Sequence, residues 1–311
     1  MNVQCVYGER GRSENLPDPS VTDMPMILDN CQRHGTCPLC RSMRIREMGA
    51  IKYDGPTLFS TIEVQFKRPA ELWQCLSCKS WFVQNIVPEG SAARCYATGS
   101  SDSRWATQTF EQEKTVEMVS RISFLLKDGM RVLDVGASGG GFLDFAKANG
   151  AITAAVEPSS SCRGVLRQKG HGHYSILEEV PEDRFDLIVA FDLVEHLYDL
   201  DGFMVRCAAL LSPGGKLVIL TGDIGSLGAR LSRARWWYVR FPEHIVFPSY
   251  QFIRGQRAFQ ILSWDRTYAS RQFCSSVGEA IQALIRGLCA GDYRGLPAPG
   301  PDHALMVLRK R

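Results

Sequence analysis

The sequence predicts an α/β protein with a doubly wound, largely parallel sheet, preceded by a small cysteine-rich unit. Three observations support this prediction. Strand-like and helix-like runs alternate from residue 129 onward, as expected for parallel strands joined by crossover helices. A glycine-rich turn, VGASGGG (135–141), follows the first strand-like run. Two Cys-x-x-Cys pairs, Cys37/Cys40 and Cys75/Cys78, lie upstream of it.

The composition places the chain among ordinary globular proteins. Its 311 residues suffice for one large and one small domain, with 45% hydrophobic and 22% charged residues. The formal net charge of +3 gives no global field that would favour nucleic acid. No apolar run approaches the roughly 20 residues of a membrane span. Eleven cysteines without a secretory signal favour a reduced, cytoplasmic setting, and the polar N-terminus reads as a flexible arm.

The elements are expected in the following order. Apolar spacing predicts a helix over 104–129, closed by Gly129. Strands are expected at 131–135, 151–156, 184–194, 216–222, 258–269 and 303–311. Helices are expected at 141–150, 160–170, 200–211 and 276–288, and SPGG (212–215) is expected to form a turn.

The glycine-rich turn is suited to bringing bare backbone close to a ligand. Its spacing departs from the dinucleotide pattern G-x-G-x-x-G, because Ser138 stands at the central glycine position between Gly136 and Gly141. Asp134 precedes the first glycine by two residues, and it would repel a pyrophosphate and attract the cationic end of a ligand. From the residues alone, a tight turn without a ligand is the alternative.

The next strand-like run also ends in an acid. In AVEP, Glu157 follows residues 151–156, where a carboxylate can accept hydrogen bonds from both hydroxyls of a ribose. Four segments in order then resemble the class I S-adenosylmethionine-dependent methyltransferases over residues 130–221. These segments are VLDVGASGGGF, AAVEPS, FDLIVAFDLVEHL and LLSPGGKLVI.

This resemblance implies an enzyme with a Rossmann-like, seven-stranded sheet whose last strand is antiparallel, and with S-adenosyl-L-methionine as its methyl donor. It implies that Gly136, Ser138 and Gly140 line the methionine part of the cofactor. It further implies that Asp134 holds the amino end and that Glu157 binds the ribose. Asp192, in FDLVEHL, is also expected among the cofactor-binding residues.

The paired Cys-x-x-Cys motifs predict a tetrahedral zinc site formed by Cys37, Cys40, Cys75 and Cys78. Four thiolates leave no open position for water, so the Zn²⁺ would be structural. Cys31 and His34 are weaker candidate ligands, and buried free cysteines are the alternative.

A zinc ribbon before such a domain resembles bacterial sugar C-methyltransferases and related natural-product enzymes. The resemblance also covers the pair Glu243 and His244 in FPEHIVFPS, although Phe241 stands where a tyrosine is expected.

Methyl transfer to a hydroxyl or an acidic C–H group requires a base, and histidine is suited to that role. His244 is the preferred candidate, with Glu243 as a group that orients it or shares its work. His196, in VEHL, is the second candidate base, and Tyr96 is a weaker candidate for a contact with the acceptor. The alternatives are a pocket-shaping role for His196 and a surface loop position for His244.

The segment ARLSRARWWYVRFPEH combines arginines with flat aromatic side chains. Such a combination suits a phosphorylated or nucleotide-linked acceptor. An amphipathic lid whose aromatics pack onto the sheet explains the same pattern.

The leading hypothesis is therefore a methyltransferase for a small-molecule acceptor, namely a nucleotide-linked sugar or a natural-product intermediate. An RNA methyltransferase that grips nucleic acid with the zinc ribbon is the alternative, and a non-enzymatic cofactor-binding protein is a third. The expected organisation is an arm (1–30), a zinc ribbon (31–92), a helical connector (93–128) and the methyltransferase domain (129–311).

Overall fold

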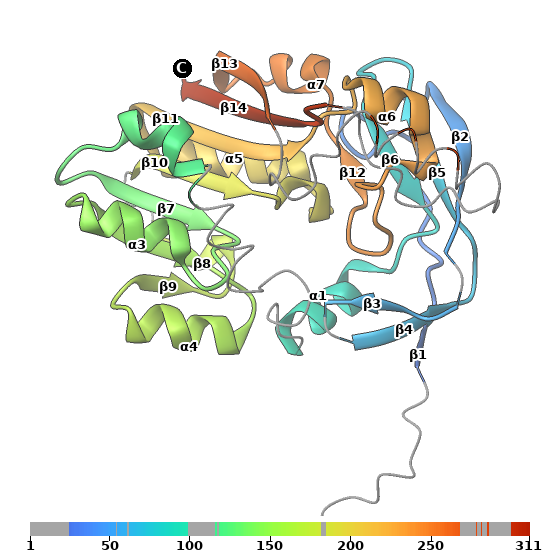
Figure 1. Cartoon of the computed structure of the whole chain (residues 1–311), viewed down its shortest axis with the longest axis horizontal. Coiled ribbons are helices and arrows are strands. Elements are labelled where there is room, and N and C mark those ends of the chain that lie inside the picture. The colour runs from blue at the N-terminus through green and yellow to red at the C-terminus, as the bar shows by residue number, and fades with distance from the viewer. Residues whose placement is uncertain are drawn as a thin grey trace, which may run out of the picture.

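A computed structural model of the chain describes residues 25–53, 55–60, 62–98, 116, 118–181, 185–267, 278, 281, 285 and 300–311. A large α/β unit and a smaller, strand-rich N-terminal unit lie side by side (Figure 1). The helix α1 (Glu89–Thr98) leads out of the smaller unit and lies between the two (Figure 1).

The large unit is built on a seven-stranded sheet in the order β13-β14-β11-β10-β7-β8-β9. The strands β7 to β11 are parallel to one another, and β14 is antiparallel to both β11 and β13. This order confirms the expected seven-stranded sheet with an antiparallel last strand. The strands are β7 (Arg131–Val135), β8 (Ile152–Val156), β9 (Gly172–Tyr174), β10 (Phe185–Phe191), β11 (Leu211–Gly222), β13 (Phe259–Thr267) and β14 (His303–Lys310).

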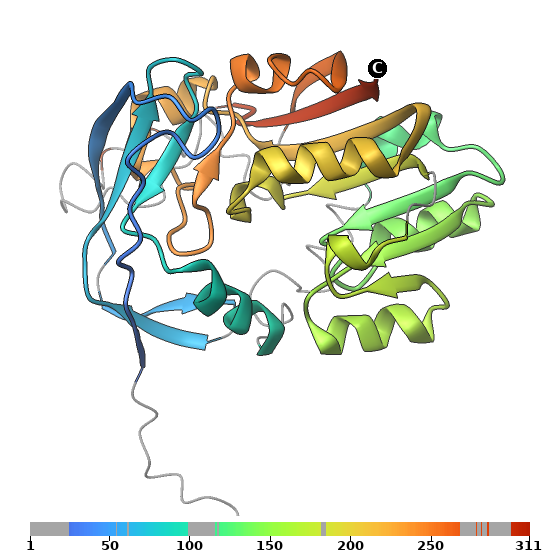
Figure 2. The ribbon, with the colours of Figure 1, turned by 180° about the vertical axis from the view of Figure 1, so that it is seen from behind.

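Alternate residues of each central strand enter two different cores. In β10, Leu187 and Val189 face the core that contains α3 (Gly141–Ala148) and α4 (Ser160–Gln168). Ile188 and Ala190 face the core that contains α5 (Leu200–Leu210), which covers the face turned toward the viewer in Figure 2. Burial on both faces explains why these strands read as continuous apolar runs in the sequence.

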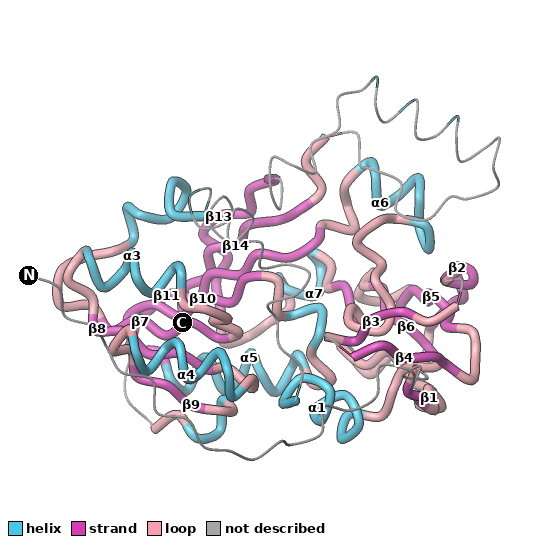
Figure 3. The backbone as a smooth tube through the Cα atoms, turned by 60° about the horizontal axis from the view of Figure 1, so that its bottom comes forward, coloured by secondary structure: helices cyan, strands magenta, loops and turns pink. Residues whose placement is uncertain are grey.

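The N-terminal unit contains two small sheets. One has the order β1-β4-β3, and the other has the order β12-β6-β5-β2. Figure 3 shows these strands gathered at one end of the molecule, away from α3, α4 and α5. The strands are β1 (Met26–Leu28), β2 (Ile45–Ile51), β3 (Thr57–Phe59), β4 (Ile62–Phe66), β5 (Ala70–Cys75), β6 (Trp81–Gln84) and β12 (Val246–Phe247).

The strand β12 joins the two units, because it follows the large unit's fifth parallel strand in sequence but pairs with β6 of the small one. Its register sets Val246 opposite Phe82 and Phe247 opposite Trp81. Just before it, the carbonyl of Ile245 accepts a hydrogen bond from Val83 N at 2.8 Å. The short helices α6 (Leu227–Ser232) and α7 (Tyr250–Arg254) lie before and after residues 233–249, which we call the crossing segment.

Several elements differ from those expected. The strand β9 and the helices α6 and α7 were not expected. The turn expected at 212–215 lies inside β11, at a register shift against β10. Part of the arm expected at 1–30 is ordered, since Met26–Leu28 forms β1 and pairs with β4.

Other expectations fall largely outside the described residues. These are the start of the arm (1–24), most of the helix at 104–129 and most of the helix at 276–288. Of the connector, residues 118–122 are helical, and the 3-10 helix η2 (Ser123–Leu125) follows them. Among the described residues, no helix combines the length and apolar character needed to cross a membrane.

The close packing at Gly222 yields a stability prediction. A Cβ atom there would lie 2.6 Å from the Trp236 ring and would also collide with the Tyr238 ring. We expect Gly222→Ala to destabilise the chain by about 1–3 kcal/mol, because an overpacked core must shift. The midpoint of urea unfolding measures this loss.

Gly164→Ala is the matched control, because nothing lies within 4 Å of its added Cβ in α4. That variant should be stabilised by up to about 1 kcal/mol through helix propensity. Equal urea midpoints for the two variants would contradict the packing argument.

Candidate active site and metal centre

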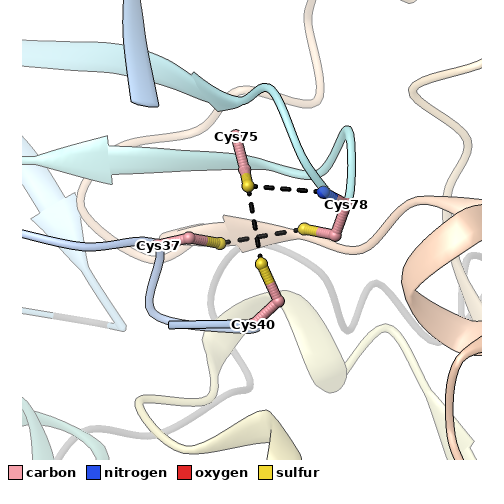
Figure 4. Close-up of side chains that lie close together, drawn as sticks. All are labelled: Cys37, Cys40, Cys75 and Cys78. Atoms are coloured by element: carbon pink, nitrogen blue, oxygen red, sulfur yellow. Dashed lines mark hydrogen bonds between the residues drawn. The ribbon is translucent and has the colours of Figure 1, made fainter. Parts of the chain in front are cut away.

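The four predicted zinc ligands converge from two loops of the N-terminal unit (Figure 4). The sulfur of Cys37 lies 3.8 Å from that of Cys78, and the sulfur of Cys40 lies 3.5 Å from that of Cys75. Within the described residues, this is one of two groups with spacing suited to a metal ion, and its sulfurs all lie within 4.8 Å of one another. Cys31, the alternative ligand, is exposed and lies outside the cluster.

The two loops that carry the cysteines have matching geometry. In each loop the first cysteine's N–H donates to a carbonyl five residues later, from Cys37 to Ser42 and from Cys75 to Ser80. The residue after each second cysteine is left-handed, with φ of 60° at Arg41 and 65° at Lys79. Such paired turns are typical of zinc knuckles, in which the backbone supports the thiolates.

The sulfur positions fit a tetrahedral cation. Zn–S bonds of about 2.3 Å place the sulfurs of a regular tetrahedron about 3.8 Å apart. The hydrogen bond with Cys78 raises the pKa of the Cys37 thiol, and it lowers the pKa of Cys78 to about 5. One thiolate thus opposes ionisation of its neighbour, so a cation is needed before all four sulfurs can be charged.

The glycine-rich turn joins β7 to α3 through three left-handed residues. These are Gly136, Ser138 and Gly140, with φ of 81°, 48° and 77°. A Cβ atom at Gly136 would lie 3.1 Å from the Leu193 side chain, so the turn passes close to the segment after β10. Gly140 immediately precedes α3, whose first backbone N–H groups lack partners within the helix and can receive a polar ligand.

Three acids lie at the carboxyl ends of neighbouring strands. Asp134 is in β7, Glu157 follows β8 and Asp192 follows β10. Asp134 and Glu157 are buried. The Glu157 carboxylate accepts hydrogen bonds from Ser138 N at 2.9 Å and from Ser159 N at 2.8 Å. Glu157 therefore ties the glycine-rich turn to the end of β8.

A second cluster forms around the two histidines. Glu195 and His196 come from the 3-10 helix η4 (Val194–His196), and His244 lies in the loop before β12. One ligating atom from each of these residues lies within 4.8 Å of the others. The two imidazole rings are 4.8 Å apart between centroids. Tyr96 of α1 shares a 3.0 Å hydrogen bond with His196 Nδ1, so the N-terminal unit contributes directly to this cluster.

Glu195 was not among the expected site residues, yet it is the centre of the polar network. Its side chain is fully buried and accepts hydrogen bonds from the Tyr238 hydroxyl and, at 2.8 Å, from the Thr221 hydroxyl. Burial, and next the charge of Asp192, raise the pKa of Glu195 to about 7. The sequence offered one signal for it, since an acid follows an apolar strand at this position, next to His196.

His244 is buried, and its orienting partner differs from the one expected. Its Nδ1 bonds to the Tyr238 carbonyl at 2.7 Å, whereas Glu243 accepts a hydrogen bond from Ser60 N at 2.9 Å. The two neighbouring side chains thus point to different partners, and Glu243 does not orient His244. Burial, and next the charge of His196, hold the pKa of His244 well below 6.5.

Within the arginine- and aromatic-rich segment 229–244, some side chains form buried hydrogen bonds and others line a cavity. The indole N–H groups of Trp236 and Trp237 both donate to the Asp302 carboxylate. Arg235 and Arg240 instead line a cavity of about 230 Å³. Its other lining residues include Lys52, Tyr53, Trp237, Phe241 and Glu243.

Phe241, which stands where a tyrosine was expected, stacks on Tyr53 with ring centroids 5.6 Å apart. It is buried and also packs edge-to-face against Phe66 at 4.7 Å. This position therefore contributes packing rather than a hydroxyl group.

Comparison with known proteins agrees with this architecture. Residues 107–256 match a family model described as a methyltransferase domain. A ubiquinone biosynthesis O-methyltransferase of Bradyrhizobium sp. (strain ORS 278) is 39% identical over 103 residues, which are 30% of this chain and 40% of that protein. The corresponding protein of Nitrobacter winogradskyi is 36% identical over 103 residues, 30% of this chain and 39% of that protein.

The chain thus spans about two fifths of the length of these curated relatives. Among solved structures, a SAM-dependent methyltransferase from Archaeoglobus fulgidus has a TM-score of 0.46 and 17% identity, covering 64% of this chain and 94% of that one. Another from Mesorhizobium loti has a TM-score of 0.43 and 18% identity, covering 61% of this chain and 96% of that one.

The order of the seven strands, the glycine-rich turn and the family match all indicate a methyltransferase domain. Residues 107–256 thus match a methyltransferase domain and are similar to the class I S-adenosylmethionine-dependent methyltransferases.

Proposed function

We propose that the protein transfers a methyl group from S-adenosylmethionine to a hydroxyl or acidic C–H group of a small-molecule acceptor. The observation that carries this proposal is the cluster of partly exposed His196 with buried His244 and Glu195. His196 and Glu195 follow β10, which pairs directly with β7, the strand that leads into the glycine-rich turn. One candidate base, His196, and the glycine-rich turn thus follow the carboxyl ends of adjacent strands, where this fold class binds ligands.

Glu157 is suited to hold the ribose. Each of its two oxygens accepts one backbone N–H, from Ser138 and from Ser159. A carboxylate can accept about four hydrogen bonds over its two oxygens, so an acid at this position suits a ligand with two neighbouring hydroxyls. Gly136, Ser138 and Gly140 offer bare backbone beside the methionine part, and Asp134 and Asp192 supply the negative charge for its cationic end.

His244 is suited to remove the acceptor proton. Its Nδ1–H donates to the Tyr238 carbonyl, which leaves the lone pair on Nε2 for the proton. When bound, S-adenosylmethionine would supply the methyl group, and the acceptor atom that loses its proton to His244 would receive it. His196, paired with Tyr96, is the second candidate base, and Glu243 remains a candidate contact of the acceptor because it lines the cavity of about 230 Å³.

The cavity lining favours an anionic acceptor. Lys52, Arg235 and Arg240 face it together with aromatic side chains. Cations and flat rings suit a phosphorylated or nucleotide-linked molecule. The curated relatives are named for O-methyl transfer, which is in line with an oxygen acceptor.

We further propose that the cysteine cluster holds structural Zn²⁺. The Ser249 hydroxyl donates to the Cys78 carbonyl, and the Gln251 amide donates to the Ser77 carbonyl at 2.9 Å. The loop of the second cysteine pair therefore supports the segment that follows His244. In this arrangement the metal stabilises the position of the base and takes no part in the chemistry.

The zinc proposal predicts one tightly held Zn²⁺ per chain after treatment with a chelating resin. The double variant Cys75→Ser/Cys78→Ser should lose it, because two of four thiolates are removed. Cys31→Ser is the matched control, since that thiol is exposed and outside the cluster. Elemental analysis of the purified chains decides the matter: a double variant that retains its zinc would disprove the assignment.

The cofactor proposal predicts that Glu157→Ala weakens binding of S-adenosylmethionine. Loss of a carboxylate that accepts ribose hydroxyls should cost at least about tenfold in affinity, since hydrogen bonds to charged groups contribute about 1.5–3 kcal/mol each. Isothermal titration calorimetry measures this change. Glu63→Ala, an exposed position on β4, should bind like the unaltered chain; equal affinity in all three proteins would place the ribose elsewhere.

The base proposal predicts that His244→Ala lowers kcat by about 10²–10⁴-fold, the usual contribution of a positioned base. Affinity for S-adenosylmethionine should stay nearly intact. The assay follows labelled methyl transfer to a panel of hydroxyl-bearing and sugar-nucleotide acceptors. His173→Ala, a histidine in β9 outside the cluster, should keep full turnover.

The pH profile gives a second test of this base. Since burial holds the pKa of His244 well below 6.5, the side chain is already neutral at pH 6.5. The acid limb of kcat should therefore fall below pH 6.5 and vanish in His244→Ala. A large defect in His196→Ala alone would move the role to His196, and salt-dependent labelling of RNA would instead support the RNA alternative.

A further inference from the structure

Glu195, His196 and His244 form the second group of potential metal ligands among the described residues. They comprise one carboxylate and two imidazoles, and one ligating atom from each lies within 4.8 Å of the others. His196 Nε2 lies 3.9 Å from Glu195 Oε1. Ligands of a tetrahedral cation with bonds of about 2.0–2.2 Å lie about 3.3–3.6 Å apart, so only a small closure is needed.

Both histidines are oriented by a bond at the other ring nitrogen. His196 Nδ1 pairs with the Tyr96 hydroxyl, and His244 Nδ1 bonds to the Tyr238 carbonyl. These bonds engage Nδ1 in both rings, so Nε2 is the nitrogen through which each histidine would meet a cation. Such outer bonds are typical of metal-ligating histidines, because they fix the tautomer and the ring orientation.

The carboxylate is held in the same way. The Tyr238 hydroxyl donates to Glu195 Oε1, and the Thr221 hydroxyl donates to Oε2 at 2.8 Å. The Glu195 backbone is also fixed, since its carbonyl accepts Ile245 N at 2.8 Å. The side chain of His196 is 22% exposed and that of Glu195 is not exposed, so a cation can enter from the His196 side.

We propose that Glu195, His196 and His244 bind a second divalent transition-metal cation, such as Zn²⁺, in competition with the methyl acceptor. Two imidazoles and one carboxylate suit Zn²⁺ and Co²⁺, and three protein ligands leave a coordination position open. The cation uses the Nε2 lone pair that would otherwise accept the acceptor proton. The competition, unlike the binding itself, rests on the function proposed above.

Binding is tested with Co²⁺ on the full chain carrying its zinc in the cysteine cluster. Equilibrium dialysis should give one additional Co²⁺ per chain, with a visible spectrum typical of nitrogen and oxygen ligands. His196→Ala and Glu195→Gln should each lose this equivalent, whereas His173→Ala, outside the cluster, should keep it. His196→Ala is the safer variant, since its side chain is partly exposed and its removal strains the core least.

Two outcomes overturn the binding proposal. One is the absence of an extra equivalent in the unaltered chain. The other is a spectrum with thiolate charge-transfer bands alone, which would mean that Co²⁺ has merely replaced the metal of the cysteine cluster.

The competition is tested separately by adding Zn²⁺ to the methyl-transfer assay. Zn²⁺ should raise the apparent KM for the acceptor and leave that for S-adenosylmethionine unchanged. Bound cation without inhibition overturns the competition but leaves the site, and activation by Zn²⁺ overturns both the competition and the role of His244 as a free base. A chain without any methyl transfer but with an extra Co²⁺ equivalent would contradict the proposed function alone.

Discussion

The antiparallel pairing of β12 with β6 is the contact on which the rest of the site depends. The residue before β12, Ile245, gives its carbonyl to Val83 N and its N–H to the Glu195 carbonyl, each at 2.8 Å. Buried backbone groups must be paired, so these two hydrogen bonds fix the loop between the N-terminal unit and η4. His244 immediately precedes Ile245, and its ring is thereby held beside His196.

Hydrogen bonds stabilise the buried acid of the polar cluster. A buried carboxylate is costly unless hydrogen-bonded, and Glu195 has hydroxyl donors on both oxygens. The Tyr238 hydroxyl is also 3.2 Å from Asp192, yet it has a single proton to donate. Asp192 thus lies close to Glu195, and burial together with the charge of Asp192 raises the pKa of Glu195. Charges held in a site without bulk water act strongly on a reacting group.

The sequence predicted the parts of this structure that depend on local pattern. The runs that became β7 and β10 are buried on both faces, β8 is buried at its C-terminal end, and the paired cysteines lie on matching loops. The strand β9 escaped prediction because its three residues, Gly-His-Tyr, contain no apolar run. It exists because β8 offers an open edge, which is a property of the sheet and not of the segment.

The partners of the site residues were harder to foresee for the same reason. Glu243 and His244 are adjacent in sequence, but Glu243 meets Ser60 and His244 meets Tyr238. Likewise, Trp236 and Trp237 share Asp302, which lies more than sixty residues further along the chain. Periodicity carries no information about such contacts, since tertiary packing decides them. The motif located the histidine, whereas the fold determined its environment.

The site draws on segments that lie far apart in the chain, which gives the cysteine cluster its importance. Tyr96 comes from α1, Glu195 and His196 come from η4, and His244 comes from the crossing segment. None of the three segments places a base on its own. The Cys78 carbonyl accepts a hydrogen bond from the Ser249 hydroxyl, and Ser249 N donates to the Ser80 hydroxyl at 3.0 Å, so the small unit fixes the end of the crossing segment that leads into α7. A metal held by the cysteine cluster, as proposed above, would therefore influence the geometry of the base through these hydrogen bonds without meeting the acceptor.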